Sequence, residues 1–266
     1  MRTLLVTGAT GFIGRHLQAA MAEWPRFDYE VVLWDRRTMG DLLSRSDRDA
    51  ALRTLKPRAV LHLAWASTNS DGYQDDPLNS SWGQASSSFL RECIDEGTWF
   101  IAIGSAADDP RDHALNSPYS LSKRAMRLAF DTASRSNEIT LLRPQYVVSF
   151  EDQRPRVVRA YLQNRLCPSF ELKQPDAVLD FIHVSDVVSG ILTAIDNRVL
   201  GTVELGSGYL HSVAQLVGAA ERWAVDGGGE SRGFPRANPS PTKPQALLQL
   251  GWRPTHTEAM FSVAAT

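Results

Sequence analysis

The stretch that decides the fold is Gly8-Ala9-Thr10-Gly11-Phe12-Ile13-Gly14, which follows a short apolar run at residues 3–7. A helical pattern continues from it with Arg15-His16-Leu17. One glycine permits a tight strand-to-helix turn, one lets the backbone approach a pyrophosphate, and one lets the helix pack against the strand. The free N–H groups at a helix N-terminus also attract an anion. The stretch therefore predicts a βαβ unit that binds a dinucleotide.

Short apolar runs alternate with helical patterns along the first two thirds of the chain. The predicted strands are residues 3–7, 30–34, 59–64, 99–103 and 139–142. This alternation is typical of a parallel sheet with helices on both faces. Two later runs, 178–184 and 202–205, are expected to return to the same sheet or its edge, with a helix at 187–196 between them. The predicted fold class is α/β, a Rossmann-like doubly wound parallel sheet.

Length and loop signals give the expected domain organisation. The 266 residues suffice for one large α/β domain or a nucleotide-binding domain with a small appendage, but not for two independent domains. We expect residues 1–150 to form the dinucleotide-binding core, to which 177–206 return. Pro and Arg punctuate the segment 151–176, and Gly, Pro and Arg punctuate 227–244, so both are expected to be loops with short elements. Because ligands in open α/β sheets bind beyond the carboxyl ends of the strands, we assign 151–176 and 207–266 to a small C-terminal substrate-binding region.

Composition favours an ordinary protein with a small-molecule partner. Hydrophobic residues make up 43% and charged residues 22%, and the formal net charge of -2 would attract neither nucleic acid nor anionic lipid. Cys93 and Cys167 lack CxxC spacing and predict neither a disulfide nor a metal site. Gly8 interrupts the first apolar run before it reaches signal-peptide or transmembrane length. We expect a cytoplasmic protein that binds no membrane, no nucleic acid and no metal.

Asp35 is the candidate ribose ligand of the cofactor. It lies 21 positions beyond Gly14, close to where a Rossmann fold places the carboxylate that binds ribose hydroxyls. An Asp that merely opens a surface loop is the alternative. Arg36 and Arg37 follow, and either guanidinium suits adenine or a 2′-phosphate. The carboxylate favours NAD and the arginines favour NADP, so both cofactors stay open. NADP is slightly preferred because the predicted reaction is a reduction.

The stretch Ser117-Pro118-Tyr119-Ser120-Leu121-Ser122-Lys123 predicts the start of a helix. Tyr119 and Lys123 then lie one turn apart on one face. An ammonium group and a helix N-terminus both stabilise a phenolate, so we expect the Tyr119 pKa to fall below its usual value of about 10, towards the range for general acid–base catalysis. A half-buried Tyr beside a surface Lys is the alternative interpretation of this spacing.

Ser105 follows the predicted strand 99–103, at the carboxyl edge where a ligand is expected. Its hydroxyl would hold a substrate carbonyl against Tyr119. The glycine turn, Ser105 and the pair Tyr119 and Lys123 occur together in this order. A catalytic role is therefore favoured over that of a half-buried Tyr beside a surface Lys. We therefore predict Ser105, Tyr119 and Lys123 as the catalytic residues of a nicotinamide-dependent oxidoreductase.

Further motifs follow in a fixed order: Leu61-His62-Leu63-Ala64, Leu142-Arg143-Pro144, Asp180-Phe181-Ile182-His183-Val184, Gly206-Ser207-Gly208 and Leu250-Gly251-Trp252-Arg253-Pro254. With them the chain resembles, over nearly its whole length, the extended short-chain dehydrogenase/reductase superfamily and within it the NAD-dependent epimerase/dehydratase family. The resemblance implies that Asp41 and Leu42 lie beside adenine, Ala64 lies beside the cofactor ribose, and Lys123 holds the nicotinamide ribose hydroxyls. The full expected cofactor-binding set is Gly8, Thr10, Gly11, Phe12, Ile13, Gly14, Asp35, Arg36, Asp41, Leu42, Leu63, Ala64, Trp65, Tyr119 and Lys123.

Within the superfamily, Leu63-Ala64-Trp65, Asn79 with Trp82, and Gly104-Ser105 resemble bacterial nucleotide-sugar 4-ketoreductases. This resemblance implies NAD(P)-dependent reduction of a keto group on a nucleoside-diphosphate-linked 4-keto-6-deoxy sugar, with Tyr119 as general acid. Three alternatives stay open: a nucleotide-sugar epimerase or dehydratase that retains NAD, a carbonyl reductase acting on a non-sugar ketone, and a non-catalytic dinucleotide-binding module. The non-catalytic module ranks last, because Ser105, Tyr119 and Lys123 are all present.

The substrate side departs from the family pattern. Tyr146 and Leu179 stand where many nucleotide-sugar relatives have an Asn and an Arg that face the diphosphate. Arg154, Arg156 and Arg159 are candidate replacements, although arginines in a loop are usually solvated. We predict Ser105, Tyr146 and Arg156 as substrate-binding residues. The resemblance also implies a homodimer formed through the Tyr119 helix and the helix at 82–96.

Overall fold

The computed structural model describes residues 2–24, 27–65, 73–108, 116–133, 138–154, 156–167, 169–225 and 243–261. The chain divides into two compact units. The first comprises Met1–Arg143 with Ile195–Val203, and the second comprises Pro144–Ala194 with Glu204–Thr266. The roles predicted for the segments 151–176 and 207–266 stay predictions.

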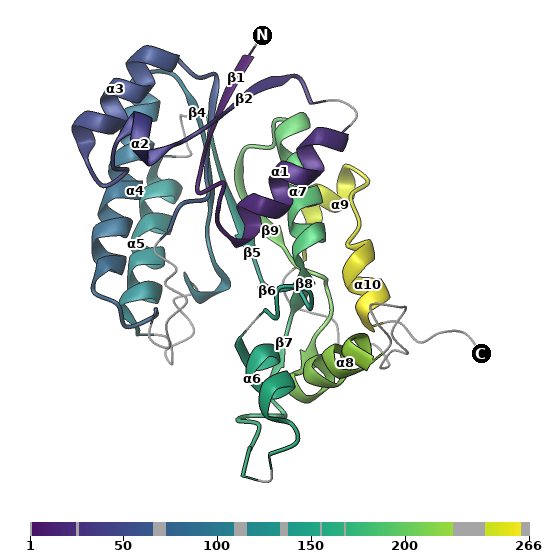
Figure 1. Ribbon diagram of the computed structural model, residues 1–266. Helices are drawn as coiled ribbons and strands as arrows, with labels where there is room; N and C mark the ends of the chain where they lie inside the picture. The colour runs from purple at the N-terminus through teal and green to yellow at the C-terminus, as the bar shows by residue number, and fades with distance from the viewer. Residues whose placement is uncertain are drawn as a thin grey trace. The chain divides into compact units, whose positions relative to one another are not determined.

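The central sheet and the helices that follow its strands begin at the N-terminus. Their bounds are β1 (Arg2–Thr7), α1 (Phe12–Glu23), β2 (Tyr29–Leu33), α2 (Arg36–Met39), α3 (Arg45–Leu55), β3 (Ala59–His62), α4 (Leu78–Asp95), β4 (Trp99–Ile103), the short 3₁₀ turn η1 (Ala106–Asp108), α5 (Pro118–Ala133), β5 (Ile139–Pro144) and β9 (Gly201–Leu205). The six strands lie in the order β2-β1-β3-β4-β5-β9 (Figure 1). β1 pairs in parallel with β2 and β3, β3 with β4, and β4 with β5. The predicted doubly wound parallel sheet is confirmed, and residues 202–205 join it as β9.

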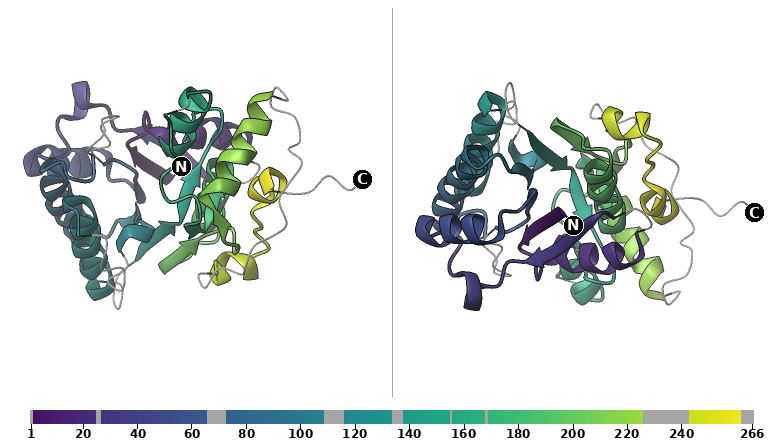
Figure 2. Two further views of the ribbon diagram at one scale, coloured as in Figure 1. Left: turned by 90° about the horizontal axis from the view of Figure 1, so that it is seen from below. Right: turned by 90° about the horizontal axis from the view of Figure 1, so that it is seen from above.

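The sheet is covered by α3, α4 and α5 on one face and by α1 on the other (Figures 1 and 2). β3 is buried throughout and β4 almost throughout, as strands covered on both faces must be. The core between the sheet and α3, α4 and α5 includes Leu5, Leu52, Val60, Phe89, Phe100, Met126 and Phe130. The carboxyl ends of β1, β3 and β4 are held rigidly by this packing, and they carry the candidate site.

The second unit contains β6 (Tyr146–Val148), α6 (Arg156–Asn164), β7 (Val178–Leu179), β8 (Phe181–His183), α7 (Val184–Asp196), β10 (His211–Ser212), α8 (Val213–Val225), α9 (Gln245–Gln249) and α10 (Thr255–Phe261). Its core is a cluster that includes Val148, Phe181, Leu216, Ala220 and Phe261. The loops predicted at 227–244 fall almost entirely outside the described residues. Within the described part of the chain, no helix is long and apolar enough to cross a membrane.

The prediction that residues 178–184 return to the central sheet or its edge is wrong. β8 pairs in parallel with β6, and β7 pairs in antiparallel with β10, in two separate two-stranded sheets. The interruption is Asp180, whose carboxylate accepts hydrogen bonds from the Ser207 backbone N–H at 2.8 Å, the Ser207 hydroxyl at 2.7 Å and the Gly208 N–H at 3.2 Å. A buried carboxylate needs such partners, and here they hold this segment on the turn at 206–208.

Candidate active site

The turn between β1 and α1 accepts only glycine at two of its positions. Gly8 has φ +71°, and a Cβ there would lie 2.5 Å from the backbone nitrogen of Ala64. A Cβ on Gly14 would lie 2.4 Å from the Gly8 carbonyl oxygen. Because both obstacles are backbone atoms, a side chain at either position would force the β1 and β3 ends or the start of α1 apart.

The start of α1 offers backbone donors to an anion. Gly11 is the N-cap residue and provides no side-chain hydrogen bond to the first turn, where Phe12 and Ile13 lie half-buried. Gln18 donates a 2.8 Å hydrogen bond to the Ala9 carbonyl and so holds the turn against the helix, while Thr10 stays exposed. The first-turn N–H groups of a helix together with its dipole suit a pyrophosphate, so the residues present fit a dinucleotide.

A buried polar network that the sequence analysis missed joins the ends of β1 and β3. The Thr7 hydroxyl lies 2.8 Å from His62 Nδ1 and accepts a hydrogen bond from the Ala64 N–H at 3.3 Å. His62 Nε2 lies 2.9 Å from the Ser86 hydroxyl. Burial, assisted by the charges of nearby cations, lowers the His62 pKa to about 3, so the imidazole is neutral and serves as a structural link. Polar residues at the ends of apolar strands are the signal that points to such a link.

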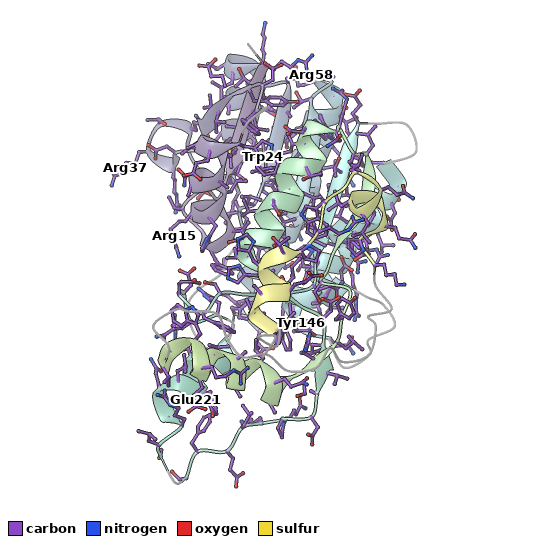
Figure 3. All side chains as sticks on the ribbon, turned by 90° about the vertical axis from the view of Figure 1, so that its right-hand side faces the viewer. Arg15, Trp24, Arg37, Arg58, Tyr146 and Glu221 are labelled. Atoms are coloured by element: carbon purple, nitrogen blue, oxygen red, sulfur yellow. The ribbon has the colours of Figure 1, made fainter. Side chains whose placement is uncertain are left out.

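The loop after β2 already pairs several of the residues predicted to meet adenosine. Asp35 caps α2 by accepting a 2.9 Å hydrogen bond from the Arg37 N–H, and Arg36 forms a 2.7 Å ion pair with Asp41. Arg37 projects outward from the chain (Figure 3). Leu42 packs into the core instead of facing solvent. The ribose and adenine roles of these residues stay predictions.

Ser105, Tyr119 and Lys123 come together at the carboxyl end of β4. The Ser105 hydroxyl lies near enough to the Tyr119 hydroxyl to lower the pKa of the phenol. The Lys123 ammonium is buried, donates to the Ile103 carbonyl at 3.1 Å and lies 5.8 Å from the centre of the Tyr119 ring. The backbone of Tyr119 is held by a 3.0 Å hydrogen bond from its N–H to the Gln74 carbonyl. This places an acid, a hydrogen-bonding hydroxyl and a cation within one small volume.

The expected lowering of the Tyr119 pKa is wrong for the chain by itself. Burial raises this pKa to about 12, and the hydrogen bond from Ser105 only partly offsets the rise. Burial also lowers the Lys123 pKa from its ordinary value of 10.5 to about 7, with the carboxylate of Asp108 acting in the opposite direction. The same packing that brings the two groups together removes their hydration, and loss of hydration penalises the charged form of each.

Trp65 covers Lys123 in a way that spacing could not reveal. The lysine ammonium lies 3.6 Å from the centre of the indole, and the indole meets the Tyr119 ring edge to face at 6.1 Å. The indole N–H donates a 2.8 Å hydrogen bond to the side-chain carbonyl of Asn79. Asn79 is fully buried and donates to the backbone carbonyl of Tyr73 at 2.6 Å. Contact with the face of an aromatic ring replaces part of the stabilisation that an ammonium group loses when burial removes its hydration.

Replacing Lys123 by Met is expected to change how stability depends on pH. In the folded chain the pKa of this lysine is about 7, while its ordinary value is 10.5. Between these pH values the unfolded chain binds a proton that the folded chain lacks, so the wild-type free energy of unfolding rises with pH through this window. Below pH 7 both states carry the charge, and the buried charge costs stability in full.

Urea unfolding from pH 6 to pH 10 measures this effect as the stability of the wild type minus that of Lys123→Met, which should rise above pH 7. Lys173→Met is the control, because Lys173 is exposed and its removal should leave a pH-independent difference. A flat profile for Lys123→Met would contradict the burial of a charged amine at this position.

The two other predicted substrate residues lie in the second unit. Tyr146, labelled in Figure 3, begins β6 and is 38% exposed. Its ring packs against Phe181. Arg156 begins α6, but its side chain falls outside the described part of the chain. Their roles stay predictions.

Three solved structures show what the fold is similar to. UDP-glucose 4-epimerase from Thermus thermophilus in complex with NAD matches with a TM-score of 0.67 and 22% identity over 96% of this chain and 94% of that chain. RMD from Pseudomonas aeruginosa, complexed with NADPH, matches with a TM-score of 0.68 and 21% identity over 96% of this chain and 94% of that chain. The dTDP-4-dehydrorhamnose reductase from Yersinia enterocolitica matches with a TM-score of 0.66 and 20% identity over 82% of this chain and 79% of that chain. At these identities the likeness shows the fold.

Family membership comes from sequence. No curated protein sequence matches the chain. The family model described as NAD dependent epimerase/dehydratase family matches residues 4–206, which include the glycine turn, Ser105, Tyr119 and Lys123. The chain therefore belongs to the NAD-dependent epimerase/dehydratase family and is an NAD(P)-dependent enzyme of the short-chain dehydrogenase/reductase type.

Proposed function

We propose that the enzyme reduces the keto group of a nucleoside-diphosphate-linked 4-keto-6-deoxy sugar, with Tyr119 as the general acid. The observation that carries this proposal is the meeting of the Ser105 and Tyr119 hydroxyls beside the buried Lys123 ammonium. A phenol whose pKa is about 12 holds its proton at neutral pH, which is the form that a proton donor needs.

The glycine turn and the first turn of α1 would hold the dinucleotide, which would supply the hydride for the carbonyl carbon. As negative charge develops on the carbonyl oxygen, Tyr119 transfers its phenolic proton to that oxygen and the alcohol forms. Ser105 donates a hydrogen bond to the same oxygen and so stabilises the developing charge. The positive charge of Lys123 stabilises the phenolate that remains on Tyr119, and this role requires the ammonium form.

The cofactor is proposed to be NADP in preference to NAD. The Asp35 carboxylate already caps α2, and Arg37 extends outward with its guanidinium exposed, as a ligand for a 2′-phosphate must be (Figure 3). The neighbour complexed with NADPH supports this choice, and the neighbour complexed with NAD supports the other.

The dimer and the substrate residues are also proposals. α4 and α5 lie side by side (Figure 2). α5 exposes Leu121 and Leu128, which suits a homodimer formed through these two helices. Tyr146 and Arg156 are proposed to bind the nucleotide sugar. The neighbour named dTDP-4-dehydrorhamnose reductase supports a nucleotide-sugar substrate.

The test is turnover on a panel of nucleoside-diphosphate 4-keto-6-deoxy sugars, with NADPH and NADH in separate reactions. We expect one molecule of reduced nicotinamide to disappear for each keto group reduced, and NADPH to react faster than NADH. Conversion of UDP-glucose without net nicotinamide consumption would instead establish the epimerase, which is the second candidate because of the likeness to UDP-glucose 4-epimerase. Turnover confined to non-sugar ketones would establish a general carbonyl reductase.

A further inference from the structure

A buried carboxylate next to the catalytic residues takes part in the proposed reaction only through its charge, which raises the Lys123 pKa. Asp108 is the last residue of η1 and is 1% exposed. Its carboxylate accepts hydrogen bonds from Arg143 Nε at 3.0 Å and from Arg143 Nη2, and it also accepts one from Arg127 Nη1 at 3.1 Å. Arg143 comes from β5 and Arg127 comes from α5. One carboxylate therefore ties three elements together.

The same 3₁₀ turn wraps around Ser105. The Asp108 N–H donates to the Ser105 carbonyl at 3.1 Å, and the Ala107 N–H donates to the Ser105 hydroxyl oxygen at 3.1 Å. With the hydroxyl oxygen accepting from Ala107, its proton can point at Tyr119 or at a substrate oxygen. The position of η1 therefore sets the direction of the Ser105 hydroxyl.

Arg127 connects this turn to the catalytic face of α5. Tyr119, Lys123 and Arg127 follow each other at intervals of four residues, so they lie along one stripe of the helix. The contact of Arg127 with Asp108 thus fixes the spacing between the stripe and η1. On the other side, the Arg143 side chain runs over Gly104, where an added Cβ would lie 3.0 Å from Arg143 Cγ.

Stability alone does not account for this group of charges. A buried ion pair recovers its desolvation cost only with good geometry, and apolar residues of similar volume often stabilise a fold as well or better. What charge-assisted hydrogen bonds add is a defined geometry. Here the defined geometry is that of Ser105 relative to Tyr119.

We propose that Asp108 is a positioning residue that clamps η1 between Arg127 and Arg143 and thereby holds the Ser105 hydroxyl at Tyr119. The kinetic consequence rests on the proposed function, because it requires Ser105 to act on the substrate oxygen. The structural consequence, a fixed η1, holds for any reaction at this site.

The test uses Asp108→Asn, which keeps the size of the side chain and removes its charge. We expect kcat on the keto sugar to fall by about tenfold to a hundredfold, because small misplacements of catalytic groups have effects of this order. The Kd for NADPH should stay within about twofold of wild type, since the glycine turn expected to bind it does not move, and the KM for the sugar should change less than kcat. At a pH well below 7, where Lys123 keeps its positive charge with or without Asp108, the same substitution should have no further effect in the Ser105→Ala background, because Asp108 then acts only through Ser105.

Hydrogen–deuterium exchange tests the clamp without any substrate. In Asp108→Asn the amides of residues 107 and 108 should exchange about tenfold faster or more, while β4 and α5 keep wild-type protection. The control is Asp131→Asn, which removes a 50% exposed carboxylate that pairs with Arg127 at 3.7 Å and should leave exchange and kcat unchanged. If Asp108→Asn does not fold, Arg127→Met replaces it, because it leaves the pair of Asp108 and Arg143 intact and should cause a smaller change in the same direction.

The outcomes separate this inference from the proposed function. Wild-type kcat in Asp108→Asn, unchanged exchange at residues 107 and 108, or a full additional loss in the Ser105→Ala background would each overturn the positioning role. If the wild type turns over no sugar in the panel, the proposed function fails, and the exchange result alone decides the clamp: faster local exchange supports it and unchanged exchange overturns it.

Discussion

Tyr119→Phe is expected to lower kcat on the keto sugar by about 10³-fold, while the Kd for NADPH changes far less. Phenylalanine keeps the ring that packs against Trp65 at 6.1 Å and against Tyr73 at 5.4 Å, so the site keeps its shape. What is lost is the proton that must reach the carbonyl oxygen as the alcohol forms. Water is a poor replacement, because the phenol is held among aromatic neighbours.

Steady-state kinetics and a fluorescence titration with NADPH measure the two quantities. Tyr73→Phe is the matched control, because it removes a hydroxyl from the neighbouring ring and leaves Tyr119 intact, so its kcat should stay close to wild type. Full turnover in Tyr119→Phe would remove Tyr119 from the mechanism. An equal loss in both variants would mean that the aromatic cluster matters for its packing and not for its proton.

Gly8→Ala is expected to lower the free energy of unfolding by about 3 kcal/mol and to abolish dinucleotide binding. Two costs add together. The backbone at φ +71° is unfavourable for any residue with a Cβ, and the new methyl group would lie 2.5 Å from the Ala64 nitrogen and 2.7 Å from the Leu63 carbonyl carbon. Neither atom belongs to a side chain that can move aside, so the β1 and β3 ends must separate where the pyrophosphate is expected.

Gly97→Ala is the control that separates the two costs. Gly97 has φ +65°, close to that of Gly8, but no heavy atom lies within 4 Å of an added Cβ. It should therefore lose only about 1 kcal/mol and bind NADPH as the wild type does. Urea unfolding and NADPH titration of both variants give the comparison. Equal destabilisation would show that backbone strain alone, and not the approach of β3, makes glycine necessary at position 8.

The sequence by itself determined the order of the strands along the chain and the identity of the chemical groups. The spacing of Gly8, Gly11 and Gly14 works as a signal because each glycine answers a local requirement of one turn. Tyr119 and Lys123 lie on one helix, where four residues bring them to the same face regardless of the rest of the fold. Such local rules can be applied without coordinates.

Only the tertiary structure decided the environment of those groups. Burial raises the pKa of Tyr119 and lowers that of Lys123, because desolvation depends on packing by elements distant in sequence. Spacing alone reveals neither the Trp65 ring over Lys123 nor the contact of Asp108 with Arg127 and Arg143. The pairing of 178–184 away from the central sheet was likewise decided by long-range contacts of Asp180. The local sequence pattern therefore identified Tyr119 and Lys123. Their protonation states depend on contacts that form only in the folded chain.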